Sequence, residues 1–154
     1  MYNAILVPLD GSELAECVLP HVETLVRGSQ VKKLIFARVI EPLRHPSGDF
    51  LLTEDQIKEI EAGRKLAAED YLQKLSGRIK LNQGVQVQTQ VLFGMAADTL
   101  ADFATKSQAD LIIIATHGRS GVSRWVWGSV AGRILRSACV PVLMVRAPGC
   151  VPGI

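Results

Sequence analysis

A long segment rich in glycine joins an apolar run to the start of an amphipathic helix. The segment ATHGRSGVSRWVWG, residues 115–128, carries Gly118, Gly121 and Gly128 together with two arginines and both tryptophans of the chain. A helix that begins at Ser129 presents unpaired backbone N–H groups and about half a positive charge at its first turn, which favours a bound anion. Glycine permits backbone angles that other residues resist. We therefore predict that the segment curls around a polyphosphate and binds it through several N–H groups at once.

Two apolar runs end in residues that could complete such a site. The first run leads into PLDGS, residues 8–12, and a later one leads into ATHG, residues 115–118. In an open parallel sheet, ligands bind outside the carboxyl ends of the strands, where the strand order reverses. Two roles are open for Asp10, since its carboxylate could cap the following helix together with Ser12 or contact a ligand. The first role does not exclude the second.

Apolar runs alternate with amphipathic stretches along the whole chain. Continuous apolar runs are typical of parallel strands covered on both faces, and a period of about 3.6 residues indicates helices. The predicted strands span residues 4–9, 33–40, 85–93, 110–116 and 140–146, and the predicted helices span residues 13–27, 54–81, 95–107 and 129–138. This alternation predicts a single α/β domain, with a doubly wound, five-stranded parallel sheet in the order 3-2-1-4-5 and helices on both faces. We expect the domain to cover residues 1–147 and a flexible tail to cover residues 148–154.

Individual elements carry further expectations. Pro20 lies inside the first helical stretch and predicts either a kink or a late helix start. Residues 85–93 alternate valine with polar residues, which predicts an edge strand, and residues 110–116 form the most hydrophobic strand, expected at the centre. The inward faces predicted for the second and last helices comprise Ile57, Ile60, Ala67, Tyr71, Leu72, Leu75 and Ile79, and Val130, Ala131, Ile134, Leu135 and Ala138.

Composition excludes several classes of protein. The chain has 154 residues, of which 48% are apolar and 21% charged, as in a soluble globular domain. Its net charge of +2 gives no electrostatic case for binding nucleic acid or an anionic membrane. We find neither an apolar span of about 20 residues nor a secretory signal, which favours the cytoplasm. Cys17, Cys139 and Cys150 are widely spaced, which favours idle thiols over a metal site or disulfides.

The loop and its flanking strands resemble the nucleotide-binding universal stress proteins. Ala115 and Gly118, followed by nine residues and then by Gly128-Ser129, resemble the G-2x-G-9x-G-(S/T) signature of that family. The similarity covers nearly the whole chain and includes the opening ILVPLDGS, the GMAAD turn and the closing PVLMVR strand. The resemblance implies that ATP or a related adenine nucleotide, with or without Mg²⁺, binds in the cleft between the first and fourth strands.

The resemblance also implies roles for the residues of the site. Pro8 and Asp10 would border the adenine and ribose, the backbone of Val39 would hydrogen-bond the adenine edge, and Ile114 and Ala115 would line the nucleoside. The resemblance implies that Gly118, Gly128, Ser129 and Val130 hold the phosphates. Arg119 could contact the phosphates or only solvate the loop, and its charge leads us to expect the phosphate contact. The candidate set is therefore Pro8, Leu9, Asp10, Val39, Ile114, Ala115, Gly118, Arg119, Gly128, Ser129 and Val130. Ala115 departs from the family pattern, which has glycine there, and its methyl group is expected to crowd the ribose.

Other residues of the loop have simpler interpretations. Trp125 and Trp127 are expected to pin the loop to the body of the protein by packing rather than to stack on a base. His117 is expected to order the turn by hydrogen bonding rather than to act as a base. Arg124 carries no prediction.

Nucleotide binding is better supported by the sequence than turnover. The chain contains neither the G-x-x-x-x-G-K-(S/T) motif nor a G-x-G-x-x-G motif after a strand, and no catalytic residue is predicted. Asp10 could hold Mg²⁺, but no second carboxylate is evident nearby. The leading hypothesis is an ATP-binding regulatory or sensor protein with an unknown protein partner. A slow ATP hydrolase, an adenylate-handling enzyme and a nucleotide-free dimerisation module remain as alternatives. The resemblance further implies a homodimer formed along the last strand, residues 140–146.

Overall fold

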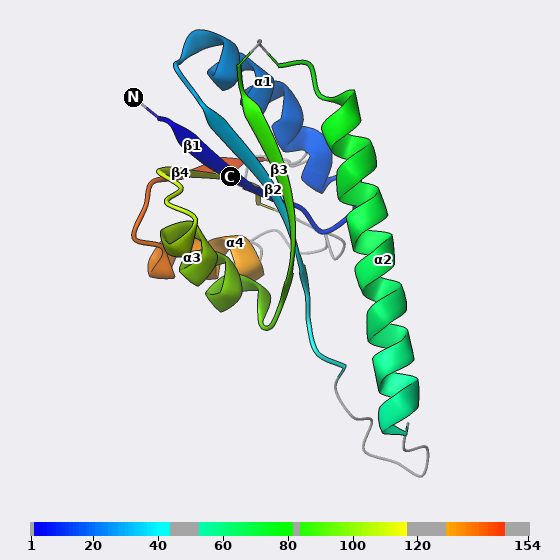
Figure 1. Ribbon diagram of the computed structural model, residues 1–154. Helices are drawn as coiled ribbons and strands as arrows, with labels where there is room; N and C mark the ends of the chain where they lie inside the picture. The colour runs from blue at the N-terminus through cyan, green and yellow to red at the C-terminus, as the bar shows by residue number, and fades with distance from the viewer. Residues whose placement is uncertain (1, 44–52, 82–83, 117–128, 147–154) are drawn as a thin grey trace.

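Strands and helices alternate along the chain, as predicted. The computed structural model describes residues 2–43, 53–81, 84–116 and 129–146 (Figure 1). The strands are β1 (Ala4–Pro8), β2 (Lys33–Ile40), β3 (Gln86–Phe93), β4 (Leu111–Ala115) and β5 (Val142–Val145). The helices are the 3-10 helix η1 (Ala15–Val18) and the α-helices α1 (Leu19–Gly28), α2 (Glu54–Arg78), α3 (Ala96–Lys106) and α4 (Ser129–Ser137).

The strands form one parallel sheet in the order β3-β2-β1-β4-β5, which confirms the predicted topology. All residues of β1 and β4 are buried, because both strands lie inside the sheet and are covered on both faces. β4 lies inside the sheet between β1 and β5, as its apolar run predicts, and β1 has the middle position of the predicted order. β3 lies at an edge and alternates exposed with half-buried residues, as its sequence predicts.

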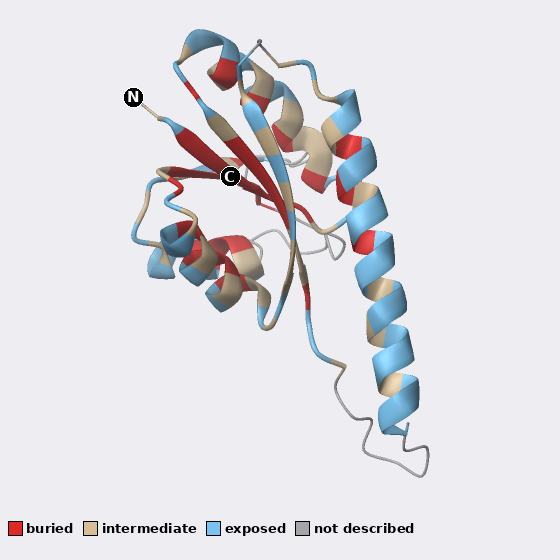
Figure 2. Ribbon diagram, viewed as in Figure 1, coloured by how far each residue is buried: buried red, intermediate tan, exposed pale blue. Residues whose placement is uncertain are grey.

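Two hydrophobic clusters hold the helices on opposite faces of the sheet. Figure 1 shows α1 and α2 on one face and α3 and α4 on the other. Alternate residues of β1 serve the two clusters, since Ile5 and Val7 pack with α1 and α2, whereas Leu6 packs with α3 and α4. Figure 2 accordingly shows β1 buried along its whole length. This double coverage leaves the strand ends and their connections as the places where the chain can bind a ligand.

Pro20 causes a late helix start rather than a kink. Residues Ala15–Val18 form η1, and α1 begins at Leu19, which places Pro20 in the first turn of the α-helix. Proline is tolerated there because the first backbone N–H groups of a helix have no intrahelical acceptor.

The inward face predicted for α2 is only partly correct. Leu72 and Leu75 are fully buried against the sheet, but Ile60 is 40% exposed and Ala67 is also exposed. The helix begins with a capping box, in which the hydroxyl of Thr53 accepts from the N–H of Gln56 at 3.2 Å. Figure 1 shows the first turns of α2 extending past the end of the sheet. Local capping therefore supports helix where the apolar periodicity has no sheet to face.

The inward face of α4 also needs one correction. Ala131 and Ile134 are buried, and Val130 and Ala138 are half-buried, as predicted. Leu135 is 46% exposed, so its predicted inward position is wrong. Consecutive helical residues point about 100° apart, and the short α4 buries only the narrow stripe that faces α3 and the sheet.

Candidate functional site

The hydrogen-bond ladders of β1 differ on its two sides. β1 pairs with β2 as far as Pro8 and Ala37, and the N–H of Leu9 continues that ladder by donating to the carbonyl of Ala37 at 2.8 Å. On the other side, within the described residues, β1 pairs with β4 only at Ile5 and Leu6. Successive N–H groups of a strand alternate in direction, so position 8 faces β4, and proline has no N–H to donate. β1 and β4 therefore lose their pairing toward the carboxyl ends, at the point where the strand order reverses.

The turn after β1 is held by its own side chains. Asp10 Oδ1 accepts hydrogen bonds from the backbone N–H of Ser12 at 2.9 Å and from its hydroxyl at 2.6 Å. The Ser12 hydroxyl oxygen in turn accepts from the N–H of Ala15, the first residue of η1, at 3.2 Å. Gly11, between them, has a φ of +85°, a conformation that favours glycine. Both side chains thus order the entry to η1, and Asp10, which is half-buried, stays at the edge of the site.

Several predicted site residues meet on the α3/α4 face of the sheet. Ile114 is buried there, and the side chains of Val39 and Val130 pack against the same cluster. Adjacent strand residues point to opposite faces, so Leu9 and Ala115 pack instead with α1 and α2. The methyl group of Ala115 is therefore a core group on the face of the sheet opposite Val39.

Only some of the remaining predicted residues lie within the described ranges. Ser129 begins α4, in agreement with the predicted helix start, and Pro8 is buried at the end of β1. The other predicted positions of the loop and tail lie outside the described residues: His117, Gly118, Arg119, Gly121, Arg124, Trp125, Trp127, Gly128, Cys150 and the tail 148–154.

Two residues near the site were not predicted to belong to it. Thr116 follows β4 and is buried, with only 8% of its surface exposed, and its N–H donates to the carbonyl of Val145 at 2.8 Å. Arg38 is half-buried near the end of β2, beside the turn of Gly11. A signal for Arg38 exists in the sequence, because it is a charge within the run LIFARVI.

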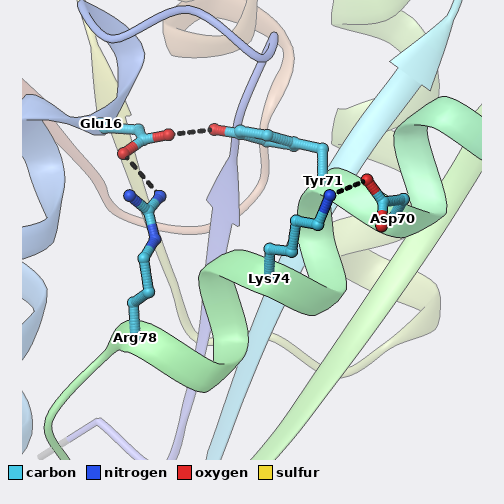
Figure 3. A pocket seen from close by; sticks show the side chains of 5 residues that line it. All are labelled: Glu16, Asp70, Tyr71, Lys74 and Arg78. Atoms are coloured by element: carbon cyan, nitrogen blue, oxygen red, sulfur yellow. Dashed lines mark hydrogen bonds and ion pairs between the residues drawn. The ribbon is translucent and has the colours of Figure 1, made fainter.

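A polar cluster lies next to this turn, on the α1/α2 side. The hydroxyl of Tyr71 donates to Glu16 Oε1 at 3.1 Å, and Arg78 forms an ion pair with Glu16 Oε2 at 2.9 Å (Figure 3). Burial raises the pKa of Tyr71, and the negative charges of Glu16 and Asp10 raise it further. The phenol therefore stays protonated at physiological pH and donates to Glu16.

Metal and thiol chemistry find little support among the described residues. Within the described ranges, no group of three or more His, Cys, Asp and Glu side chains could hold a metal ion. Cys17 is half-buried, and burial raises the pKa of its thiol, while Cys139 is exposed. Of the helices in the described ranges, none is both long and apolar enough to cross a membrane.

The sheet order and the reversal between β1 and β4 define a doubly wound α/β protein whose ligand site is expected at the carboxyl ends of the strands. Solved structures share this fold. That of protein MJ0577 from Methanocaldococcus jannaschii has a TM-score of 0.83 at 24% identity, covering 97% of this chain and 99% of that one. A universal stress protein in complex with cAMP has a TM-score of 0.68 at 20% identity, covering 95% and 98%.

Sequence comparison gives the family. The universal stress protein family matches residues 1–146. Universal stress protein MJ0531 of Methanocaldococcus jannaschii is 29% identical over 151 residues, covering 96% of this chain and 84% of the relative. The chain belongs to the universal stress protein family.

Proposed function

We propose that this chain binds an adenine nucleotide, with ATP as the expected ligand, at the carboxyl ends of β1 and β4. The observation that carries the proposal is the loss of β1–β4 pairing beyond Leu6, beside the turn of Asp10. Similar structures under 25% identity hold cAMP, AMP and dAMP, and all three ligands contain an adenine nucleoside and a phosphate.

Each part of the nucleotide has a proposed position. The adenine lies on the face that Val39 and Ile114 share, with its edge against the backbone of Val39. The ribose lies at the Asp10 turn, where a carboxylate can accept from its hydroxyl groups. The phosphates lie at the start of α4, where the N–H groups that follow Ser129 and the helix dipole favour negative charge. Gly118 and Gly128 complete the phosphate site by family resemblance, and the charge of Arg119 is a further proposed contact.

The bound nucleotide acts as a signal rather than as a substrate. Phosphoryl transfer requires charge neutralisation and a positioned nucleophile, and the chain lacks the lysine of a P-loop motif. Occupancy instead changes the surface that the residues before α4 offer to a partner. A slow ATP hydrolase is the second candidate, and ADP release above a protein-free blank would favour it.

A homodimer through β5 belongs to the same proposal. β5 pairs with β4 on one side, and the described residues place no strand on its other side. Leu143 is 38% exposed on this strand, and Val142 and Met144 are half-buried. An apolar strand with an unpaired edge favours pairing with another chain, and a second copy would cover it.

Calorimetry with a charge variant at α4 tests the site. The purified chain is first acid-denatured and its supernatant analysed for nucleotide, and the nucleotide-free protein is then titrated with AMP and with ATP, with and without Mg²⁺. Ser129→Asp places a carboxylate where the phosphates are proposed, while aspartate remains a good residue for a helix start. We expect the affinity for ATP to fall on the order of tenfold or more.

The matched control for this experiment is Ser137→Asp, at the other end of the same helix. This variant carries the same change of charge and should leave the affinity for ATP unchanged. Failure of the wild-type chain to bind either nucleotide would exclude the proposed function. Equal affinities of wild type and Ser129→Asp would exclude the phosphate position at α4.

A further inference from the structure

The guanidinium of Arg38 lies directly against the turn that follows β1. A Cβ atom built on Gly11 would lie 2.9 Å from Nη1 of Arg38 and 3.0 Å from its Cζ. A Cβ atom at position 11 would therefore displace the end of the Arg38 side chain. The φ of +85° at Gly11 by itself favours glycine there, and the glycine lets the guanidinium approach the backbone of the turn.

The same guanidinium contacts the ring of Tyr71 from α2. Cζ of Arg38 lies over that ring, 5.4 Å from its centroid, which is within the range of a cation–π interaction. The ring is fixed in turn, because its hydroxyl donates to Glu16 of η1 at 3.1 Å. Figure 3 shows Arg78 reaching Glu16 from farther along α2.

These contacts connect the turn to three elements of the fold. β2 supplies Arg38, α2 supplies Tyr71, and η1, which supplies Glu16, begins directly after the turn itself. The bond from Leu9 to Ala37 fixes the start of the turn on β2, and the bonds that Ser12 donates to Asp10 act within the turn, so neither joins Gly11 to α2. The planar guanidinium, packed between Gly11 and the Tyr71 ring, supplies that connection. A lysine ammonium can lie over the Tyr71 ring, but it has no planar face to pack against Gly11 at the same time.

We propose that Arg38 is a positioning residue for ribose recognition, acting through Gly11 to hold the carboxylate of Asp10 where it meets the ribose hydroxyls. Tyr71 orients the guanidinium, and Glu16 orients Tyr71. The inference rests on the proposed nucleotide site and adds to it the device that selects a ribonucleotide over a nucleotide without ribose hydroxyls. Arg38 itself need not touch the nucleotide.

Discrimination between two nucleotides tests this role. The probes are AMP and 2′,3′-dideoxy-AMP, which differ only in the ribose hydroxyls, and each is titrated calorimetrically into wild type and Arg38→Met. Wild type should prefer AMP by roughly tenfold, as expected for hydrogen bonds to a charged acceptor. Arg38→Met should bind dideoxy-AMP as wild type does, but its preference for AMP should fall to about twofold. A general loss of structure would instead weaken both ligands alike.

Two further variants complete the design. Arg27→Met removes an arginine that is 57% exposed near the end of α1 and should keep the full preference for AMP. Arg38→Lys keeps the charge and should also lose most of the preference for AMP over dideoxy-AMP. If circular dichroism shows that Arg38→Met is unfolded, the result for Arg38→Lys decides the test.

The possible failures are distinguishable. If wild type binds neither nucleotide, the proposed function fails and the role of Arg38 fails with it. If wild type binds both nucleotides equally, or if the arginine variants keep the wild-type preference, the nucleotide site stands and the role of Arg38 is refuted.

Discussion

The carboxylate of Asp110 accepts a hydrogen bond from the backbone N–H of Asn3 at 2.8 Å, across more than a hundred residues of sequence. Its other oxygen accepts from the N–H of Ala4 at 3.2 Å, and the N–H of Asp110 donates to the carbonyl of Ala4 at 2.9 Å. Asp110 thus joins β1 to β4 at their amino ends, whereas Pro8 ends the pairing at their carboxyl ends. The proposed site lies at the carboxyl ends of β1 and β4, where the two strands are not paired.

Replacing this carboxylate should destabilise the protein. Asp110→Ala leaves the N–H groups of Asn3 and Ala4 without their acceptor, and we expect the free energy of unfolding to fall by about 1 to 3 kcal/mol. Urea denaturation followed by circular dichroism measures the change. Asp70→Ala, which removes an exposed carboxylate of α2, is the control and should change the stability by less than about 0.5 kcal/mol. Equal effects of the two variants would refute the role of Asp110.

The two halves of α2 should respond differently to truncation. Leu72→Ala removes a fully buried side chain, and we expect a loss of about 2 to 5 kcal/mol. Ile60→Ala changes a residue that is 40% exposed to a better helix former, so the stability should stay within about 0.5 kcal/mol of wild type. The same urea titration compares both variants. A loss at Ile60 as large as that at Leu72 would mean that another surface covers the first half of α2.

Much of the fold follows from the sequence, because a parallel strand that is buried on both faces is apolar along its whole length. The runs around Ile5 and Ile113 are continuously apolar because helices cover both faces of β1 and β4. The edge strand β3 alternates apolar with polar residues because one of its faces is exposed. Helix faces are less predictable. The apolar spacing that includes Ile60 in α2 is compatible with a packed stripe, yet only the three-dimensional length of the sheet decides where that stripe ends.

The site could be predicted only in its local parts. Asp10 and Ser12 are neighbours in sequence, so their mutual hydrogen bonds follow from turn chemistry. Arg38 escaped prediction because its partner Tyr71 comes from a helix far along the chain, and only the packing of α2 on β2 brings the two together. Contacts of that kind depend on the fold and leave no spacing to recognise.

The two described cysteines should differ in reactivity. Only the thiolate is nucleophilic, and burial raises the pKa of Cys17, while Cys139 is exposed. In a Cys150→Ser background at neutral pH, iodoacetamide should label Cys17 roughly tenfold or more slowly than Cys139, as quantified by peptide mass spectrometry. Labelling of Cys17 should accelerate as pH rises, since more thiolate forms. In denaturant the two rates should converge, and a difference that persisted there would refute the structural explanation.

Disruption of β5 should abolish the proposed dimer. Leu143→Arg places a charge on the exposed side of the strand, where a second copy would bury it, and an unpaired buried charge is costly. Light scattering coupled to size exclusion should change from the mass of two chains to that of one. Leu66→Arg, at a side chain that is 66% exposed on α2, is the control and should remain a dimer. A wild-type chain that elutes as a monomer would refute the dimer itself.

The methyl group of Ala115 can be tested as a core group or as an obstacle to the ribose. Its side chain packs with α1 and α2 and is only 8% exposed, on the face opposite Val39. Ala115→Gly should therefore lower the free energy of unfolding by about 1 to 2 kcal/mol, from the lost methyl burial and the added backbone freedom. The affinity for AMP should remain within about twofold of wild type, because a group in the core takes no space from the ligand. If the methyl group crowded the ribose, calorimetry would instead find clearly tighter AMP binding in Ala115→Gly, and this placement of the side chain would be refuted.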